Sequence, residues 1–216
     1  MTLFPRVLGN ALAGSIIYAM LVTPVSAASI KQAKQSLAAN DFETALTELA
    51  PLARSGNAEA NNLLGLMYLQ GNGVAQDTAQ AKAYFEVGAN TGHLESIQNL
   101  NIILDAEYKE ELKTVRPAAE AGDSVAQTRL GRMYEFGQGV AMSPADAFIW
   151  YQKAAQQNDL NGAMNLARTY NFGIGTEQDL VQAEAIYLQG AKQGHIDSMF
   201  FLGTMHFAQV SQAGTD

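Results

Sequence analysis

The chain has 216 residues, of which 48% are hydrophobic, with no cysteine, three histidines and a formal net charge of −8. This length and apolar content are sufficient for one or two globular domains. The acidic balance argues against a nucleic-acid-binding protein, and the lack of cysteine excludes disulfides, a thiol nucleophile and zinc–thiolate sites. Composition therefore indicates an ordinary acidic protein and points to no chemistry.

The first residues have the pattern of a secretory signal peptide. Arg6 is followed by an apolar run over residues 7–22, and a Thr-Pro pair and small residues at 25–28 come next. Small residues at this spacing suit a signal peptidase, so we expect cleavage after Ala27 or Ala28 and a mature protein in a bacterial periplasm. An uncleaved anchor is the alternative, but the run is short for a membrane span of about 20 residues. We expect membrane contact only through this segment, before cleavage.

A repeated motif covers most of the remaining chain. A leucine, a tyrosine four residues later and then two glycines recur in three blocks: Leu64–Val74, Leu130–Val140 and Leu166–Thr176. A fourth block begins at Leu202. The steps between the leucines are 66, 36 and 36 residues. The step of 66 contains a degenerate copy at residues 96–101, whose loop is shortened by six residues. A fixed period of this length predicts a repeat architecture.

Each unit predicts two helices joined by a glycine loop. Small and apolar residues recur every four positions in the first helix: Ala60, Leu64 and Tyr68. Gly65 allows a neighbouring helix to approach closely, Gly71 ends the helix, and Gly73 supplies a positive φ in the loop. The second helices begin at capping residues: Asp77, Ser143 and Asp179. Such pairs bury their apolar faces only by stacking, so we expect an all-α solenoid without β-sheet.

This pattern resembles the Sel1-like repeat, a relative of the tetratricopeptide repeat with a longer loop between its helices. The third unit carries the resemblance best, as AQTRLGRMYEFGQGVAMSPADAFIWYQKAAQQN over residues 126–158. The chain departs from the pattern at Ser143, Thr176 and Asn101, and it lacks the loop after Leu104. It is similar to the cysteine-free bacterial members. The resemblance implies an α-solenoid adaptor for other proteins, often in periplasmic or envelope signalling. We expect a regulator or an assembly factor with no catalytic activity and no cofactor.

The repeat pattern divides the chain into four predicted parts. We expect a signal peptide at 1–27, a shorter tetratricopeptide-like helix pair at 28–56, the repeat array at 57–210 and a tail at 211–216. The array contains the degenerate second unit and a truncated last unit. After the degenerate unit we expect the array to restart near Asp105, as a bend in the superhelix rather than a domain boundary.

No motif in the sequence predicts catalysis or a metal site. The Gly-x-Gly loops follow helices rather than strands and lack a third glycine, so they do not predict phosphate binding. His93 and His195 follow turn glycines of equivalent units and are interpreted as turn residues. His206 stands where the other units have tyrosine and is interpreted as a packed or half-exposed residue. The rival hypothesis is an enzyme acting on cell-wall material, based only on the link of cysteine-rich relatives to penicillin binding.

A basic and aromatic surface is the predicted partner-binding site. Three positions on the first helix of each unit share a face away from the apolar stripe. In the third and fourth units these positions form what we call the strip: Arg129, Arg132, Phe136, Asn165, Arg168 and Phe172. Arginine and aromatic residues anchor many interfaces, although an ordinary solvated face is the alternative. We expect reversal of the three arginines to abolish binding of an acidic partner with little loss of stability.

The last predicted helix runs from Ile196 to about Gln209 and carries more apolar residues than one stripe can bury. The register of the earlier units predicts three residues facing inward: Ser198, Leu202 and His206. This register leaves Phe200 or Phe201 exposed. An exposed aromatic patch predicts a surface for a partner or for self-association. A loosely ordered tail, or a helix that only covers the array edge, is the alternative.

Overall fold

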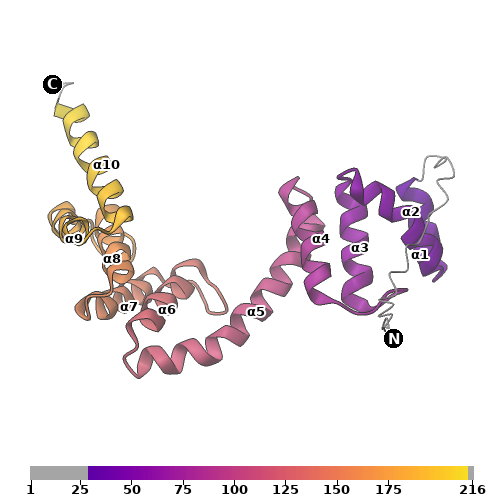
Figure 1. Ribbon diagram of the computed structural model, residues 1–216, viewed down its shortest axis with the longest axis horizontal. Helices are drawn as coiled ribbons and strands as arrows, with labels where there is room; N and C mark the ends of the chain where they lie inside the picture. The colour runs from indigo at the N-terminus through magenta and orange to yellow at the C-terminus, as the bar shows by residue number, and fades with distance from the viewer. Residues whose placement is uncertain (1–28, 214–216) are drawn as a thin grey trace, which may run out of the picture.

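The structure is a computed structural model that describes residues 29–213, the side chains of residues 208–213 excepted. This part of the chain contains ten α-helices and no strand, which confirms the all-α prediction. The helices are α1 (Ile30–Ala38), α2 (Phe42–Arg54), α3 (Ala58–Gln70), α4 (Thr78–Asn90), α5 (Leu94–Glu120), α6 (Ser124–Phe136), α7 (Pro144–Gln156), α8 (Leu160–Phe172), α9 (Leu180–Lys192) and α10 (Ile196–Ala213). They stack in sequence into an elongated, bent α-solenoid (Figure 1). The predicted signal peptide lies outside the described residues.

The local sequence signals begin and end the helices as expected. The predicted capping residues each accept a hydrogen bond from a backbone N–H in the first turn of their helix: Asp77, Ser143 and Asp179. The first helices of the three complete units end at glycines with φ between 67° and 74°: Gly71, Gly137 and Gly173. The pair formed by α1 and α2 turns at Asn40, whose φ is 58°. Short-range turn chemistry therefore sets the boundaries of these units.

The degenerate second unit contains no loop at all. The chain does not restart near Asp105 but continues as the 27-residue helix α5, which joins the two halves of the solenoid (Figure 1). No glycine interrupts residues 94–120, and Asp105 and Glu110 form ion pairs with Lys109 and Lys113 along the helix. Such pairs, three or four residues apart, support a continuous helix. The expected short loop and restart are therefore wrong.

The two halves of α5 serve two different neighbours. Ile103, in the first half, packs in the same cluster as Phe85 of α4. Ala119, in the last turns, packs with Leu130 and Met133 of α6. The first half of α5 thus replaces the first helix of the degenerate unit, next to α4, and the second half replaces its second helix, next to α6, which keeps the apolar stack continuous.

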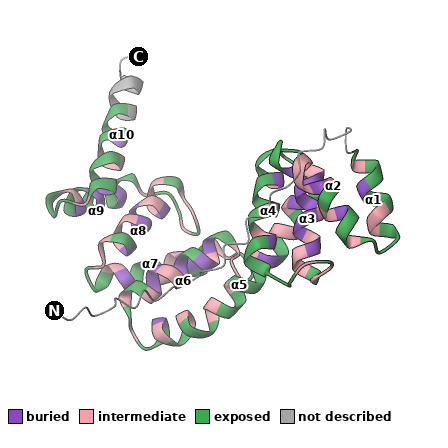
Figure 2. Cartoon of the chain, turned by 45° about the vertical axis from the view of Figure 1, so that its right-hand side comes forward, coloured by how far each residue is buried: buried purple, intermediate pink, exposed green. Residues whose placement is uncertain are grey.

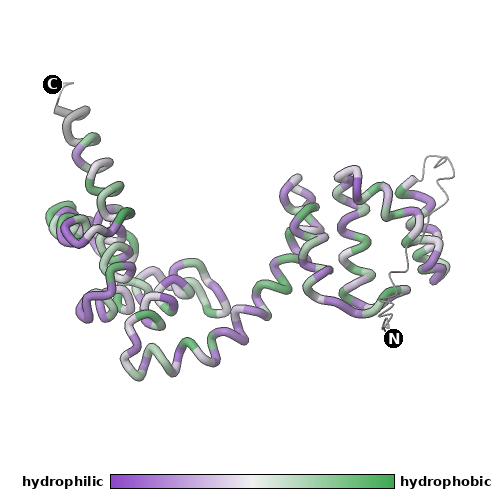
Figure 3. Tube along the Cα trace, viewed as in Figure 1, coloured by the Kyte–Doolittle hydropathy of each residue, from purple (hydrophilic) through white to green (hydrophobic). Residues whose placement is uncertain are grey.

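Apolar packing is divided among clusters between successive helices rather than gathered in one core. Buried residues lie on the helix faces that meet neighbours (Figure 2), and hydrophobic and hydrophilic residues alternate along the helices (Figure 3). Close approach depends on glycine as predicted, because a Cβ added to Gly131 would lie 2.6 Å from the Tyr151 ring. Gly65 is covered by Phe85 in the same way. Of the described helices, none has the length and apolar content needed to cross a membrane.

The last helix, α10, packs on α9 in the predicted register at two of the three expected positions. Ser198 is buried and Leu202 packs against the cluster of Tyr187 and Met205 as expected, but the third predicted residue, His206, is exposed, and Met205 is buried instead. The Phe201 ring stacks on Tyr187 of α9, with centroids 5.5 Å apart and an interplanar angle of 13°. The inward face of α10 thus includes Phe201 and Met205, and His206, about 100° further around the helix from Met205, is left toward solvent.

The exposed aromatic residues predicted on α10 are present. Phe200 is 65% exposed and Phe207 is 78% exposed, whereas Phe201 is half-buried. The helix extends to Ala213 instead of ending near Gln209. The predicted tail at 211–216 therefore begins inside the helix.

Candidate partner-binding site

The strip lies on α6 and α8, which are neighbours in the stack. A groove of ≈ 540 Å³ runs between them, and five of the six strip residues line it: Arg129, Arg132, Phe136, Asn165 and Arg168. Phe172 is not part of this lining, although it is 60% exposed at the end of α8. Phe200 and Phe201 belong to α10 and also lie outside the lining. The stacking of equivalent helices therefore brings most of the predicted site together.

Arg129 is fixed by contacts with three side chains. Its Nε and Nη2 donate to Oε1 and Oε2 of Glu111 at 2.6 Å each, and its Nη1 donates to Oε1 of Gln138 at 2.7 Å. Its guanidinium carbon lies 5.6 Å from the centroid of the Tyr108 ring. The hydrogen bonds with Glu111 raise the pKa of Arg129, although partial burial opposes them. This arginine therefore ties α5 to α6.

The same pair makes a pH-dependent contribution to stability. The hydrogen bonds from Arg129 lower the pKa of Glu111 below its ordinary value of 4.5. Stability from a lowered carboxyl pKa is present above the ordinary value and is lost as the pH falls through the folded value. We expect Arg129→Met to raise the pKa of Glu111 toward 4.5, measured by carbon-detected NMR titration of the side-chain carboxyl. An unchanged pKa in the variant would contradict this pairing in solution.

Arg168 belongs to a more deeply buried network that joins α6, α7 and α8. Its Nη2 donates to Oε1 of Glu135 at 2.6 Å, and the hydroxyl of Tyr151 donates to Oε2 of the same carboxylate at 2.7 Å. The side chain of Glu135 is only 7% exposed and that of Arg168 is 21% exposed. Burial and the bond to Glu135 raise the pKa of Tyr151, so its hydroxyl remains a proton donor. Burial lowers the pKa of Arg168, but the contacts with Glu135 outweigh this effect and raise it.

Two of the three arginines are thus neutralised by carboxylates that sequence analysis missed. Among the described residues, only Arg132 of these three has a side chain without an ion pair or hydrogen bond. The strip is therefore not a continuous basic surface. The expectation that all three arginines can be reversed without loss of stability is also wrong, because Arg168→Glu would place a second carboxylate beside the buried Glu135.

One sequence signal for the missed network was available. The position equivalent to Glu135 is Leu69 in the first unit and Asn171 in the fourth, so a charged residue at this position is an exception. A charged side chain on a helix that stacks on both sides requires a partner of opposite charge. Which arginine supplies that charge depends on the offset between helices, which the sequence does not contain.

A serine–histidine–glutamate arrangement at the start of α5 is a helix cap rather than a catalytic site. Nδ1 of His93 lies 2.9 Å from Oγ of Ser96 and accepts its backbone N–H, while Nε2 lies 3.3 Å from Glu95. Ser96 is fully buried, so no substrate reaches it. The same cap recurs at the start of α10 with His195 and Ser198. This confirms the interpretation of both histidines as turn residues, and the described residues contain no cluster of three metal-ligating side chains.

Three segments of the chain match the family model described as the Sel1 repeat: residues 58–93, 124–159 and 161–195. The chain is a Sel1 repeat protein. The matched segments 124–159 and 161–195 are the third and fourth units described above and contain α6 to α9. The strip lies on the first helix of each of these two units. Sel1 repeats generally mediate protein–protein interactions, and Sel1 repeat proteins are generally non-catalytic scaffolds.

Other proteins share part of this sequence. An uncharacterized protein of Neisseria meningitidis serogroup B is 30% identical over 137 residues, which cover 46% of this chain and 29% of that protein. A solved Sel1 repeat protein from Oxalobacter formigenes is 26% identical with a TM-score of 0.43, covering 81% of this chain and 74% of the other. A protective antigen of uropathogenic Escherichia coli with an SLR fold is 27% identical with a TM-score of 0.35, covering 82% and 51%. The match therefore spans less than a third of the Neisseria relative.

Proposed function

We propose that this Sel1 repeat protein is a periplasmic scaffold that binds another protein through the groove between α6 and α8. The observation that carries the proposal is the exposed guanidinium of Arg132, one helical turn from the exposed ring of Phe136. Both lie on a frame that the ion pairs of Arg129 and Arg168 fix in place. Arginine and aromatic side chains on a preorganised surface are the residues that dominate binding energies.

The groove fits a partner segment that carries an acidic group next to an apolar one. Arg132 offers paired N–H donors, which match a carboxylate. Phe136 and the half-buried Met164 offer apolar contact beside it. The signal-peptide pattern supports a place for this binding in the envelope, where the scaffold would regulate a signalling complex or assist in the assembly of a larger machine.

We expect Arg132→Glu to reduce partner capture about tenfold or more, because an anchor of about 2 kcal/mol is replaced by a repelling charge. Capture is measured by crosslinking in bacteria that produce the full chain, with the crosslinked product quantified. The melting temperature should not change, because Arg132 is exposed. Lys31→Glu makes the same charge change at an exposed position on α1 and should capture normally. Equal capture by both variants would place the interface elsewhere.

The same cells test the location. The protein should be recovered in the periplasmic fraction, and mass spectrometry should find Ala28 or Ser29 as its first residue. Recovery with residues 1–27 intact in the cytoplasmic fraction would overturn the proposed location without affecting the proposed groove.

We further propose that α10 mediates self-association with a second copy. Three of its apolar side chains are 48%, 65% and 78% exposed: Met199, Phe200 and Phe207. In the first and third units, the glycine equivalent to Gly203 is covered by an aromatic ring of the next helix. A Cβ added at Gly203 would meet nothing within 4 Å among the described residues. This face is therefore open to an aromatic side chain from another molecule.

Replacing Phe200 and Phe207 together with serine should convert the self-associated protein to a monomer that melts at the same temperature as the wild-type monomer, because both rings are exposed in a single copy. Multi-angle light scattering measures the mass. Phe201→Ser should instead lower the melting temperature, because its ring stacks on Tyr187. Phe201 is therefore a control for packing and not a second member of the exposed pair. An unchanged mass in the double variant would contradict the proposed surface.

A further inference from the structure

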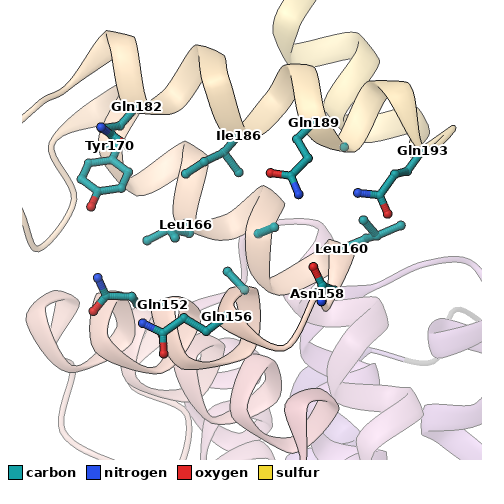
Figure 4. A pocket seen from close by; sticks show the side chains of 13 residues that line it. Gln152, Gln156, Asn158, Leu160, Leu166, Tyr170, Gln182, Ile186, Gln189 and Gln193 are labelled. Atoms are coloured by element: carbon teal, nitrogen blue, oxygen red, sulfur yellow. The ribbon is translucent and has the colours of Figure 1, made fainter.

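A second groove, of ≈ 300 Å³, lies between α7 and α9 (Figure 4). Its floor contains apolar residues of α8 and α9, among them Leu166 and Ile186. Its sides carry amide side chains: Gln152, Gln156, Asn158, Gln182, Gln189 and Gln193. No charged residue belongs to the lining. The residues of α8 that line it lie on the opposite side of that helix from those that line the strip groove, so this is a separate surface.

The amides are available to a ligand. None of these six amide side chains makes a hydrogen bond with another side chain or with the backbone in the described part of the chain, whereas Gln127 and Gln157, close by, are bonded to each other at 2.7 Å. In Figure 4 the amides of Gln189 and Gln193 extend from α9 toward the space between the two helices, whereas those of Gln152 and Gln156 lie along the exposed side of α7 at its edge. A primary amide carries both a donor and an acceptor, as a peptide group does.

The spacing of the amides matches an extended backbone. Gln152 and Gln156 are four residues apart on α7, and Gln189 and Gln193 are four residues apart on α9. Four residues advance a helix by about 6 Å. Peptide groups on one side of an extended segment recur about every 6.6 Å. Each of these two pairs therefore has the spacing of two successive peptide groups on one side of an extended segment.

We infer that this groove binds an extended, uncharged segment of a partner protein. The glutamine amides hydrogen-bond the backbone of the segment, and every second side chain lies on the apolar floor of Leu166 and Ile186. A charged side chain on this floor would lose its hydration without gaining a partner of opposite charge. Neutral amides around an apolar floor are therefore complementary to the polar backbone and apolar side chains of such a segment.

The amide lining is not a general property of the repeat. The corresponding groove between the second helices α2 and α4 is lined by Arg54, Tyr84 and the buried Asn61, and it contains no glutamine. The amide of Asn61 already donates to the carbonyl oxygens of Ala53 and Asn57. Stacked second helices alone do not produce the amide rows between α7 and α9.

The test uses the secreted protein and a blocked peptide, acetyl-Ser-Val-Ser-Val-Ser-Val-Ser-amide, as the probe. We expect the side-chain amide NMR signals of Gln156 and Gln189 to shift on titration with this peptide. Gln156→Met combined with Gln189→Met should weaken binding about tenfold or more, because hydrogen bonds on both sides are lost. Methionine keeps the chain length and the helix propensity. Gln98→Met, at an exposed position on α5 outside the groove, should bind normally.

A peptide of the same sequence with N-methylated valines separates backbone recognition from apolar contact. It should not bind, and equal binding of this peptide would overturn the inference. Failure of the unmodified peptide to bind at millimolar concentration, or full binding by the double variant, would also overturn it. Arg132→Glu should leave the affinity unchanged, and loss of binding in this variant would place the peptide in the strip groove instead.

Discussion

Arg168→Met should destabilise the protein by about 3–5 kcal/mol, because it leaves a buried charge without its partner. The Glu135 carboxylate is only 7% exposed, and the hydroxyl of Tyr151 is the other side chain that donates to it. Burial of an unpaired carboxylate costs far more than the loss of a surface ion pair. Urea denaturation followed by circular dichroism measures the change in unfolding free energy.

Two matched variants isolate the charge effect. Arg132→Met removes an exposed arginine from the same strip and should change stability by no more than about 0.5 kcal/mol. Adding Glu135→Gln to Arg168→Met should recover much of the loss, because no buried charge then remains, and the double-mutant cycle gives the coupling energy. A loss for Arg168→Met no larger than that for Arg132→Met would mean that Glu135 is solvated in solution.

The sequence predicted the parts of the fold that depend on short-range chemistry. Gly71 ends α3 with a φ of 74°, and Asp77 caps α4 as its side chain accepts the N–H of Gln80 at 2.9 Å. Both features follow from residues within a few positions of each other. The continuous helix α5 was not predicted, because a missing loop does not show whether the chain turns or continues. The available signal was the run of helix-forming and oppositely charged residues at 105–113.

The candidate site was predicted in position but not in charge. A 36-residue period places equivalent faces of α6 and α8 together, so the strip residues were found as a group. The partners of Arg129 and Arg168 lie 18 and 33 residues earlier in the chain. Which carboxylate meets each arginine depends on how far one helix is displaced along the next, and the repeat period does not determine this offset. The exposure of His206 was missed for a related reason, since the inward face of α10 depends on the stacking of Phe201 on Tyr187.

The loop glycines connect stability to the shape of the strip groove. Gly175 has a φ of 71°, and a Cβ at this position would clash with the carbonyl oxygen of Pro144, the first residue of α7. Gly139 lies equally close to the backbone of Tyr108 in α5. The loop of the third unit therefore packs on the second half of α5, as the loop of the fourth unit packs on α7. Each loop therefore fixes the angle between its own unit and the preceding helix.

Gly175→Ala should accordingly destabilise the protein by about 3 kcal/mol or more. A side chain at this positive φ costs about 1–2 kcal/mol, and the clash adds to this cost because the Pro144 carbonyl is backbone and has little freedom to move. Gly194→Ala is the matched control, with a φ of 83° and nothing within 4 Å of the added Cβ among the described residues. It should show the conformational cost alone. Urea denaturation of both variants measures the difference, which is the free-energy cost of the clash with Pro144.

Relief of the clash also changes the groove. The loop of Gly175 has to lift away from α7, and α8, which precedes this loop directly, shifts with it relative to α6. We therefore expect the Gly175→Ala variant to lose partner capture under conditions where it is still folded, while Gly194→Ala captures normally. Equal stability losses in the two variants would mean that the loop does not contact α7 in solution, and the shape of the groove would then depend on direct contacts between α6 and α8 such as the Arg168–Glu135 pair.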